Sequence, residues 1–138
     1  MSKIGIYCID DDNLINVITK HQISEYVNTD RYFLETFTNP IEAIEEIKIN
    51  FNDGIQPTVC LIDFQMPEMT GDQVIRKIKE SFPDTKCVML SGNSSASIVS
   101  DLVDENLLDY YISKPWSKEE LIEKINDCLP PIFKFSRN

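Results

Sequence analysis

Five short, largely apolar segments alternate along this chain with five longer segments whose apolar residues recur at helical spacing. The short segments are 4–9, 31–37, 58–62, 86–90 and 109–112. The helical segments are 13–27, 39–50, 71–81, 94–104 and 117–128. Regular strand–helix alternation requires a parallel sheet with helices on both faces, joined by right-handed crossovers. The pattern therefore predicts a single doubly wound α/β domain of the (βα)5 type.

Local signals mark where several of these elements begin and end. Asn39 is a favourable N-cap residue, and Pro40 follows it at the first helical position. Residues 117–120 have the spacing of a capping box, which predicts the start of the last helix. The paired prolines at 130–131 end that helix. We therefore expect the domain to cover residues 1–129 and residues 130–138 to form a C-terminal tail.

Polar residues follow four of the predicted strands at the points where these strands end. Asp10 and Asp11 follow the first strand, Asp63 the third, Ser91 the fourth and Lys114 the fifth. Ligands of doubly wound sheets gather at the carboxyl ends of the strands. We therefore expect these five side chains to lie at one edge of the sheet. Carboxylates, a hydroxyl and an amine at one edge indicate a site for a divalent metal and a phosphoryl group.

This combination of side chains suits phosphoryl transfer onto the protein itself. Mg²⁺ takes about six oxygen ligands and keeps several waters, so two carboxylates and a phosphate oxygen suit it. A carboxylate such as that of Asp63 can also accept a phosphoryl group as an aspartyl phosphate. Ser91 can hydrogen-bond one phosphoryl oxygen, and Lys114 can pair with another. In-line transfer needs mainly positioning and charge neutralisation, which such a set supplies.

Four segments carry a resemblance to a known family. They are IYCIDDD (6–12), LIDFQMPEMTG (61–71), VMLSG (88–92) and YYISKPW (110–116). Each is short, but their order and spacing together are highly specific. On these segments the chain resembles, over essentially its whole length, the receiver domains of two-component response regulators, the CheY-like superfamily. The resemblance implies a flavodoxin-like fold whose five-stranded parallel sheet has the order 2-1-3-4-5.

The resemblance also implies roles for the acidic residues. Asp63 would be the phosphoacceptor, and Asp10 and Asp11 would be the acidic pair. Asp11 would bind Mg²⁺ (or Mn²⁺) directly and Asp10 through water, with Asp63 and the Gln65 backbone carbonyl as the other protein ligands. Gln65 and Asn93 flank the site at positions that tune dephosphorylation in such domains.

A conformational switch is implied by the same resemblance. Ser91 would swing toward the phosphoryl group, and Tyr111 would move inward with it. Lys114 would contact the phosphoryl group, and the Lys114–Pro115 peptide bond would be cis. The output surface would be formed by the fourth helix (94–104), the fifth strand (109–112) and the fifth helix (117–128).

The function implied is that of a signalling phosphoacceptor, not of an enzyme that turns over a substrate. The phosphoryl group would come from a sensor histidine kinase or a histidine phosphotransfer protein of a phosphorelay. The modified surface would then act on a downstream effector domain or protein. A dimer through the output surface is a further expectation. The kinase, the output and the lifetime of the phosphoryl group are left open, as is whether the chain is complete or part of a larger protein.

Two assignments have alternatives within the sequence. Three consecutive aspartates allow Asp11 and Asp12 to be the acidic pair instead of Asp10 and Asp11. We prefer the earlier pair, because Asp10 directly follows the apolar strand and Asp12 suits a helix N-terminus. Tyr110, next to Tyr111, leaves the choice of switch aromatic open in the same way.

Two other functions use some of the same residues. In a haloacid-dehalogenase-like phosphatase, Asp10 would be the nucleophile, with Ser91 and Lys114 in the second and third motifs. That family needs a further acidic pair after its lysine. The phosphatase assignment also leaves Asp63 and the turn at 66–71 without a role. The second alternative is a docking module that acts without phosphorylation.

Composition argues against several other classes of function. The formal net charge of -10 argues against direct nucleic-acid binding by this chain. No apolar run is long enough to span a bilayer, and no signal peptide is evident, so we expect no membrane association and a cytoplasmic location. The four cysteines lack CxxC spacing, which argues against a zinc site, and three of them lie in apolar strand-like segments, which predicts buried thiols.

Overall fold

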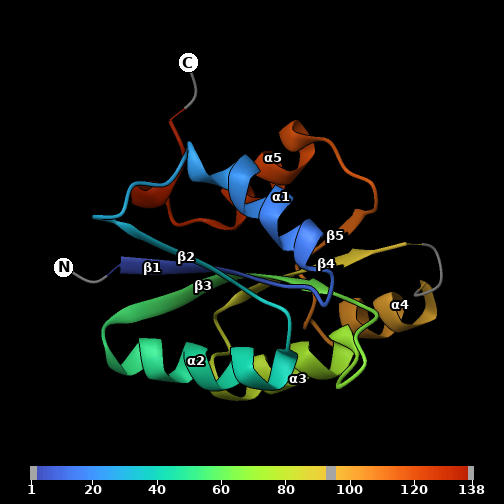
Figure 1. Ribbon diagram of the computed structural model, residues 1–138. Coiled ribbons are helices and arrows are strands. Elements are labelled where there is room, and N and C mark those ends of the chain that lie inside the picture. Colours follow the sequence, from blue (N-terminus) through green and yellow to red (C-terminus); the bar gives the residue numbers. More distant parts are fainter. Residues whose placement is uncertain (1–2, 93–95, 137–138) are drawn as a thin grey trace.

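The sheet has the predicted topology. The computed structural model describes residues 3–92 and 96–136 (Figure 1). Its five strands are all parallel and lie in the order β2-β1-β3-β4-β5. They are β1 (Lys3–Ile9), β2 (Tyr32–Phe37), β3 (Ile55–Asp63), β4 (Lys86–Ser91) and β5 (Tyr110–Ser113). The predicted (βα)5 fold and strand order are confirmed.

Helices cover both faces of the sheet. Those described are α1 (Asn13–Ser24), α2 (Pro40–Asn52), α3 (Gly71–Ser81), α4 (Ala96–Asp104) and α5 (Lys118–Cys128), followed by the 3-10 turn η1 (Pro131–Phe133). In Figure 1, α1 and α5 lie on one side of the sheet, and α2 and α3 lie on the other. Residues 93–95, which include Asn93 and the predicted start of the fourth helix, lie outside the described residues. Within the described ranges, no helix is long and apolar enough to cross a membrane.

The strands build a separate hydrophobic core on each face. In β1, Ile6 and Cys8 belong to the cluster that packs with α1 and α5, whereas Tyr7 and Ile9 belong to the cluster packed with α2, α3 and α4. This alternation follows from the two-residue period of a strand. Each of these four residues is 0% exposed, as expected for a sheet covered on both faces. The strong apolar character of β1 is therefore a direct consequence of its central place.

The cysteines are buried free thiols, as predicted. Cys8, Cys60, Cys87 and Cys128 all lie in the two cores. Burial raises the pKa of the Cys8 thiol to about 12, because the charged thiolate is poorly solvated there. These side chains therefore act as small apolar residues and not as nucleophiles.

One strand starts earlier than its sequence indicates. β3 begins at Ile55, three residues before the apolar run that predicts it. Pro57 lies inside this added part, and the pairing of β1 with β3 shifts there, from Gly5–Pro57 to Ile6–Val59. A proline has no N–H to donate to the ladder, so in a strand paired on both sides it is accommodated at a bulge such as this one.

The segment after α5 is bound to the domain. The paired prolines predict a tail from residue 130, but Phe133 and Phe135 are 8% and 6% exposed and belong to the core shared with α1 and α5. The Tyr32 hydroxyl donates to the Phe133 carbonyl, and the Phe135 N–H donates to Asn126 Oδ1. Tyr26 lies with its ring centroid 5.3 Å from that of Phe135. Residues 131–135 therefore close the core at the N-terminal end of β2.

Removal of one of these rings tests this packing. We expect Phe135→Ala to lower the free energy of unfolding by roughly 2–4 kcal/mol, because it removes a buried ring and leaves a cavity. Ile132→Ala is the matched control: Ile132 is 66% exposed, and its truncation should change stability by less than about 0.5 kcal/mol. Urea unfolding of the full chain measures both. Equal, small effects of the two substitutions would mean that the segment does not pack in solution.

Candidate functional site

The residues singled out at the strand ends meet at one edge of the sheet. Asp10 directly follows β1, Asp63 ends β3, Ser91 ends β4 and Lys114 directly follows β5. These four residues and Asp11 line one open pocket, together with Asp12, Gln65, Met66, Pro67, Thr70 and Gly92. The parallel topology thus gathers side chains from positions 10 to 114, as the sequence predicts.

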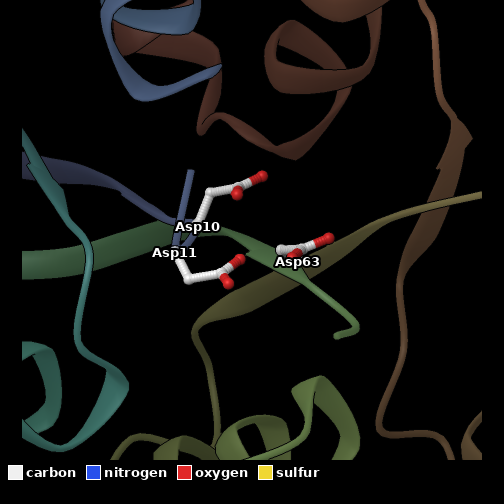
Figure 2. A group of neighbouring side chains, drawn as sticks. All are labelled: Asp10, Asp11 and Asp63. Atoms are coloured by element: carbon white, nitrogen blue, oxygen red, sulfur yellow. The ribbon is translucent and has the colours of Figure 1, made fainter. Parts of the chain in front are cut away.

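Three carboxylates form a compact acidic cluster. One carboxylate oxygen from each of Asp10, Asp11 and Asp63 lies within 4.8 Å of the other two. Figure 2 shows the three side chains extending from the neighbouring ends of β1 and β3 into the same space. Asp10 is 0% exposed and Asp63 is 6% exposed, whereas Asp11 is exposed. Negative charge is therefore concentrated at this site, and two of the three carboxylates are shielded from water.

Lys114 neutralises part of this charge. Its Nζ donates to Asp63 Oδ1 at 2.8 Å and to Asp10 Oδ2 at 3.0 Å. The Lys114 backbone N–H donates to the Ser91 carbonyl at 2.8 Å, which ties the segment after β5 to the end of β4. The Lys114–Pro115 peptide bond is cis. One ammonium group thus bridges the strand ends that carry Asp10 and Asp63.

The third aspartate of the run has a different position. Asp12 is the N-cap of α1, and its carboxylate accepts from the Leu14 N–H at 3.0 Å. The Asp12 N–H donates to Asp10 Oδ1 at 2.9 Å. Asp12 is therefore used to begin the helix, and the compact cluster contains Asp10 and Asp11 instead.

A glycine shapes the turn beyond Asp63. The Gly71 N–H donates to the Phe64 carbonyl at 2.8 Å. A Cβ at Gly71 would lie 2.6 Å from the Asp63 carbonyl oxygen and 2.9 Å from the Phe64 Cα, closer than real Cβ atoms approach backbone. The absence of a side chain lets α3 start against the end of β3, and residues 65–70 loop outward to the pocket rim. The turn signal in the sequence thus reflects this close approach.

The two adjacent tyrosines face opposite sides of the sheet. The Tyr111 hydroxyl donates to the Gly92 carbonyl at 2.9 Å, beside the site. Tyr110 packs on the other core, and the Lys124 Nζ lies 5.2 Å from the centre of its ring. Of the two, Tyr111 therefore contacts Gly92, the residue directly after Ser91.

Two contacts near the site have no clear signal in the sequence. The Asn16 side chain of α1 is buried and donates to the Asp10 and Phe37 carbonyls. The Trp116 Nε1–H donates to Gln22 Oε1 at 3.0 Å and joins the loop after Lys114 to α1. Neither Asn16 nor Gln22 belongs to a recognisable motif, because a helical polar residue gives no indication of which strand end it meets.

Comparison with known proteins settles the family. The family model described as response regulator receiver domain matches residues 6–126. The chain belongs to this family. The fold agrees: the CheY-like receiver domain protein from Methanospirillum hungatei JF-1 superposes with a TM-score of 0.75 at 25% identity, over 91% of this chain and 93% of that one.

Curated relatives of this receiver domain differ in length. The chemotaxis protein CheY of Listeria monocytogenes is 22% identical over 122 residues, which is 88% of this chain and 95% of CheY. Hybrid signal transduction histidine kinase D of Dictyostelium discoideum is 25% identical over 126 residues, which is 90% of this chain but only 7% of the kinase. The chain thus matches one short relative over nearly its full length and a small part of a much longer one.

The surroundings of Asp63, the candidate phosphoacceptor, shift the pKa of its carboxyl group. The pKa of Asp63 is raised from its ordinary 3.8 to about 6, mainly because burial disfavours the carboxylate. The hydrogen bond from Lys114 opposes this rise, and the charge of Asp10 adds to it. Burial lowers the pKa of Lys114, but its hydrogen bonds to Asp63 and Asp10 outweigh burial and leave that pKa raised. Lys114 therefore stays protonated.

The donor set of the receiver pocket fits a hard divalent cation. Three clustered carboxylates supply the oxygen ligands that Mg²⁺ prefers, and the open pocket leaves room for the waters that Mg²⁺ keeps. A cation would also relieve the repulsion that a single lysine leaves uncompensated.

Neutralising Asp63 should change how the stability of the receiver domain depends on pH. A carboxyl with a raised folded-state pKa favours folding when protonated, and this contribution is lost as the pH rises from about 4 through about 6. Asp63→Asn does not titrate, so its stability relative to wild type should increase by roughly 3 kcal/mol across that window. Urea unfolding without divalent cations measures it, with the exposed Asp84→Asn as control. A stability difference that does not vary between pH 4 and pH 7 would contradict the raised pKa.

Proposed function

We propose that this receiver domain accepts a phosphoryl group on Asp63 from a phosphohistidine, in a reaction that depends on Mg²⁺. The donor is a sensor histidine kinase or a histidine phosphotransfer protein. The observation that carries the proposal is the Lys114 ammonium, which joins Asp63 to Asp10 beside Asp11 in an open pocket. This arrangement supplies a carboxylate nucleophile, a cation-binding pair and a fixed positive charge.

The transfer is a single displacement at phosphorus. A carboxylate oxygen of Asp63 attacks phosphorus while the P–N bond to the donor histidine breaks. The electrons of that bond go to the imidazole, which takes up a proton and leaves as neutral histidine. The product is an aspartyl phosphate, so the domain itself is modified and no substrate is turned over.

Charge neutralisation is the main task of the surrounding residues. Asp10, Asp11, Asp63 and the Gln65 carbonyl would hold a Mg²⁺ or Mn²⁺ ion, which would supply Lewis-acid charge stabilisation to the transferring group. Lys114 contributes its ammonium to a phosphoryl oxygen, and the Ser91 hydroxyl donates to another. Ser91 is 3% exposed and its strand ends beside Asp63, which supports this role.

The same residues would transmit the modification. Ser91 turns toward the phosphoryl group, and Tyr111 gives up its bond to the Gly92 carbonyl and moves inward. The change biases a two-state surface made of α4, β5 and α5 toward an effector domain or protein. This surface is also where a dimer would form.

The alternatives use the pocket less well. In the phosphatase alternative Asp10 would be the nucleophile, but it is fully buried and its two oxygens accept from Asp12 N–H and Lys114. A docking module that acts without phosphorylation would need neither Lys114 nor the acidic pair. Both predict outcomes that differ from ours in one experiment.

The experiment is intact mass after incubation with acetyl phosphate, with and without Mg²⁺. We expect a Mg²⁺-dependent phosphoryl adduct on the wild type and none on Asp63→Asn, because that amide cannot attack phosphorus. Lys114→Ala should slow adduct formation by about 10²-fold or more, since it removes a charge that stabilises the transition state.

Two outcomes would reject this assignment. An adduct that survives Asp63→Asn but disappears in Asp10→Asn would support the phosphatase-like nucleophile. If Mg²⁺ binds but neither acetyl phosphate nor a phosphohistidine protein modifies the chain, the docking module is supported instead.

We further propose that the donor protein docks on α1. Leu14, Val17 and Ile18 are 64%, 55% and 42% exposed, an unusual concentration of apolar surface on one helix. Ile18 also lines an apolar groove with Ile15, Gln22, Lys114, Pro115 and Trp116, so this groove shares Lys114 with the acceptor pocket. A protein that presents its histidine to Asp63 must cover this adjoining surface.

An added charge on the outer side of α1 tests docking of the donor protein separately from the phosphoryl-transfer reaction. We expect Ile18→Glu to slow transfer from a phosphohistidine protein by about tenfold or more, because docking would bury the new carboxylate. Phosphorylation by acetyl phosphate, which needs no docking surface, should stay within about twofold of wild type. Val103→Glu makes the same change at a 52% exposed residue of α4 and is the control. Equal slowing of both donors by Ile18→Glu would reject docking on α1.

A further inference from the structure

A buried asparagine on α1 contacts the backbone at the acidic end of β1. Asn16 is 1% exposed, and its Nδ2 donates to the Asp10 carbonyl at 2.8 Å and to the Phe37 carbonyl at 3.0 Å. The two acceptors lie directly after β1 and at the end of β2. One amide group thus joins a helix to two adjacent strand ends beside the acceptor pocket.

Asp10 is held at every polar atom. Its N–H donates to the Phe37 carbonyl at 3.0 Å, and its carbonyl accepts from Asn16. Its Oδ1 accepts from the Asp12 N–H at 2.9 Å, and its Oδ2 accepts from Lys114 at 3.0 Å. The Phe37 carbonyl accepts from both Asp10 and Asn16, so three residues form one closed set of hydrogen bonds.

The asparagine is held in a way that leaves one of its own atoms unsatisfied. Its two donated bonds fix which end of the amide faces the strands, and Oδ1 is then buried with no hydrogen-bond partner among the described residues. A buried acceptor without a partner is unfavourable. An apolar side chain would avoid that penalty, so the two donated bonds are what an asparagine adds at this position.

From these contacts we infer that Asn16 is a positioning residue for the acceptor site. It fixes the backbone of Asp10, and through it the orientation of the Asp10 carboxylate and of the adjoining Asp11, for binding a divalent cation. Lys114 alone cannot keep the Asp10 carboxylate oriented, because in the proposed function its ammonium turns toward the phosphoryl group. The inference rests on that proposed function, since it gives the two carboxylates the role of holding the cation.

The test measures Mg²⁺ affinity and local backbone protection separately. Asn16→Leu keeps the approximate size of the side chain and removes both donors, and Asn16→Ala is the second variant in case the leucine is not accommodated. Thr19→Val is the matched control. Thr19 is also buried on α1, one turn further along, and its hydroxyl donates within the helix to the Ile15 carbonyl.

We expect the Asn16 variants to bind Mg²⁺ about 10- to 100-fold more weakly than wild type in calorimetric titrations, which is the usual effect of losing a group that orients a metal ligand. Without any cation, the Asp10 and Asp12 amides should exchange hydrogen at least about tenfold faster, while amides of β4 and β5 keep their rates. Thr19→Val should change neither Mg²⁺ affinity nor these two amides, even if it lowers the unfolding temperature.

The outcomes separate this inference from the proposed function. If wild type binds Mg²⁺ and a folded Asn16 variant binds it within twofold, with unchanged exchange at Asp10 and Asp12, Asn16 is not a positioning residue. If Thr19→Val weakens Mg²⁺ binding as much as the Asn16 variants do, the effect is general destabilisation and the inference is wrong. If wild type binds no Mg²⁺, the metal-dependent function fails, and the exchange rates alone decide whether Asn16 holds Asp10.

Discussion

A single ammonium group between two buried carboxylates governs this edge of the sheet. Lys114 reaches Asp10 and Asp63 from the loop after β5, so the ends of three strands are joined by one charged contact. Removing either partner of such a pair would leave a charge poorly solvated. Because the cluster holds three carboxylates and Lys114 pairs with only two of them, negative charge remains that a cation or a proton can balance. The pKa of Asp63 is raised mainly by burial, and the charge of Asp10 adds to this rise.

The sequence predicts those features of the fold and site that depend on patterns among neighbouring residues. Apolar periodicity and strand-end polar residues are short-range patterns, and the topology converts them into a sheet order and a shared pocket. The Asp10–Asp11–Asp63 cluster could therefore be anticipated. Asn16 could not, because nothing in a helix shows that one side chain meets two carbonyls of neighbouring strands. The packing of residues 131–135 was hidden for a similar reason: an aromatic residue after paired prolines does not indicate which surface it contacts.

The two sides of α1 carry different kinds of residues. Its inner side contributes Asn16, Thr19 and Ile23, which are buried against the sheet. Its outer side exposes Leu14, Val17 and Ile18 next to the groove that contains Trp116. One helix thus contacts the Asp10 backbone on its inner side and exposes apolar residues on its outer side.

The packing of residues 131–135 also determines where a domain of this kind can be cut or joined. The family match ends at residue 126, yet Phe133 and Phe135 complete the core beyond it. A fusion protein or a fragment designed on the family boundary would lose both rings. The Ile132 and Phe133 carbonyls are held by Arg31 and Tyr32, at the beginning of β2. Any polypeptide attached after residue 136 would thus depart from the opposite edge of the sheet to Asp63, and a signal from the acceptor would have to cross the full height of the domain to reach it.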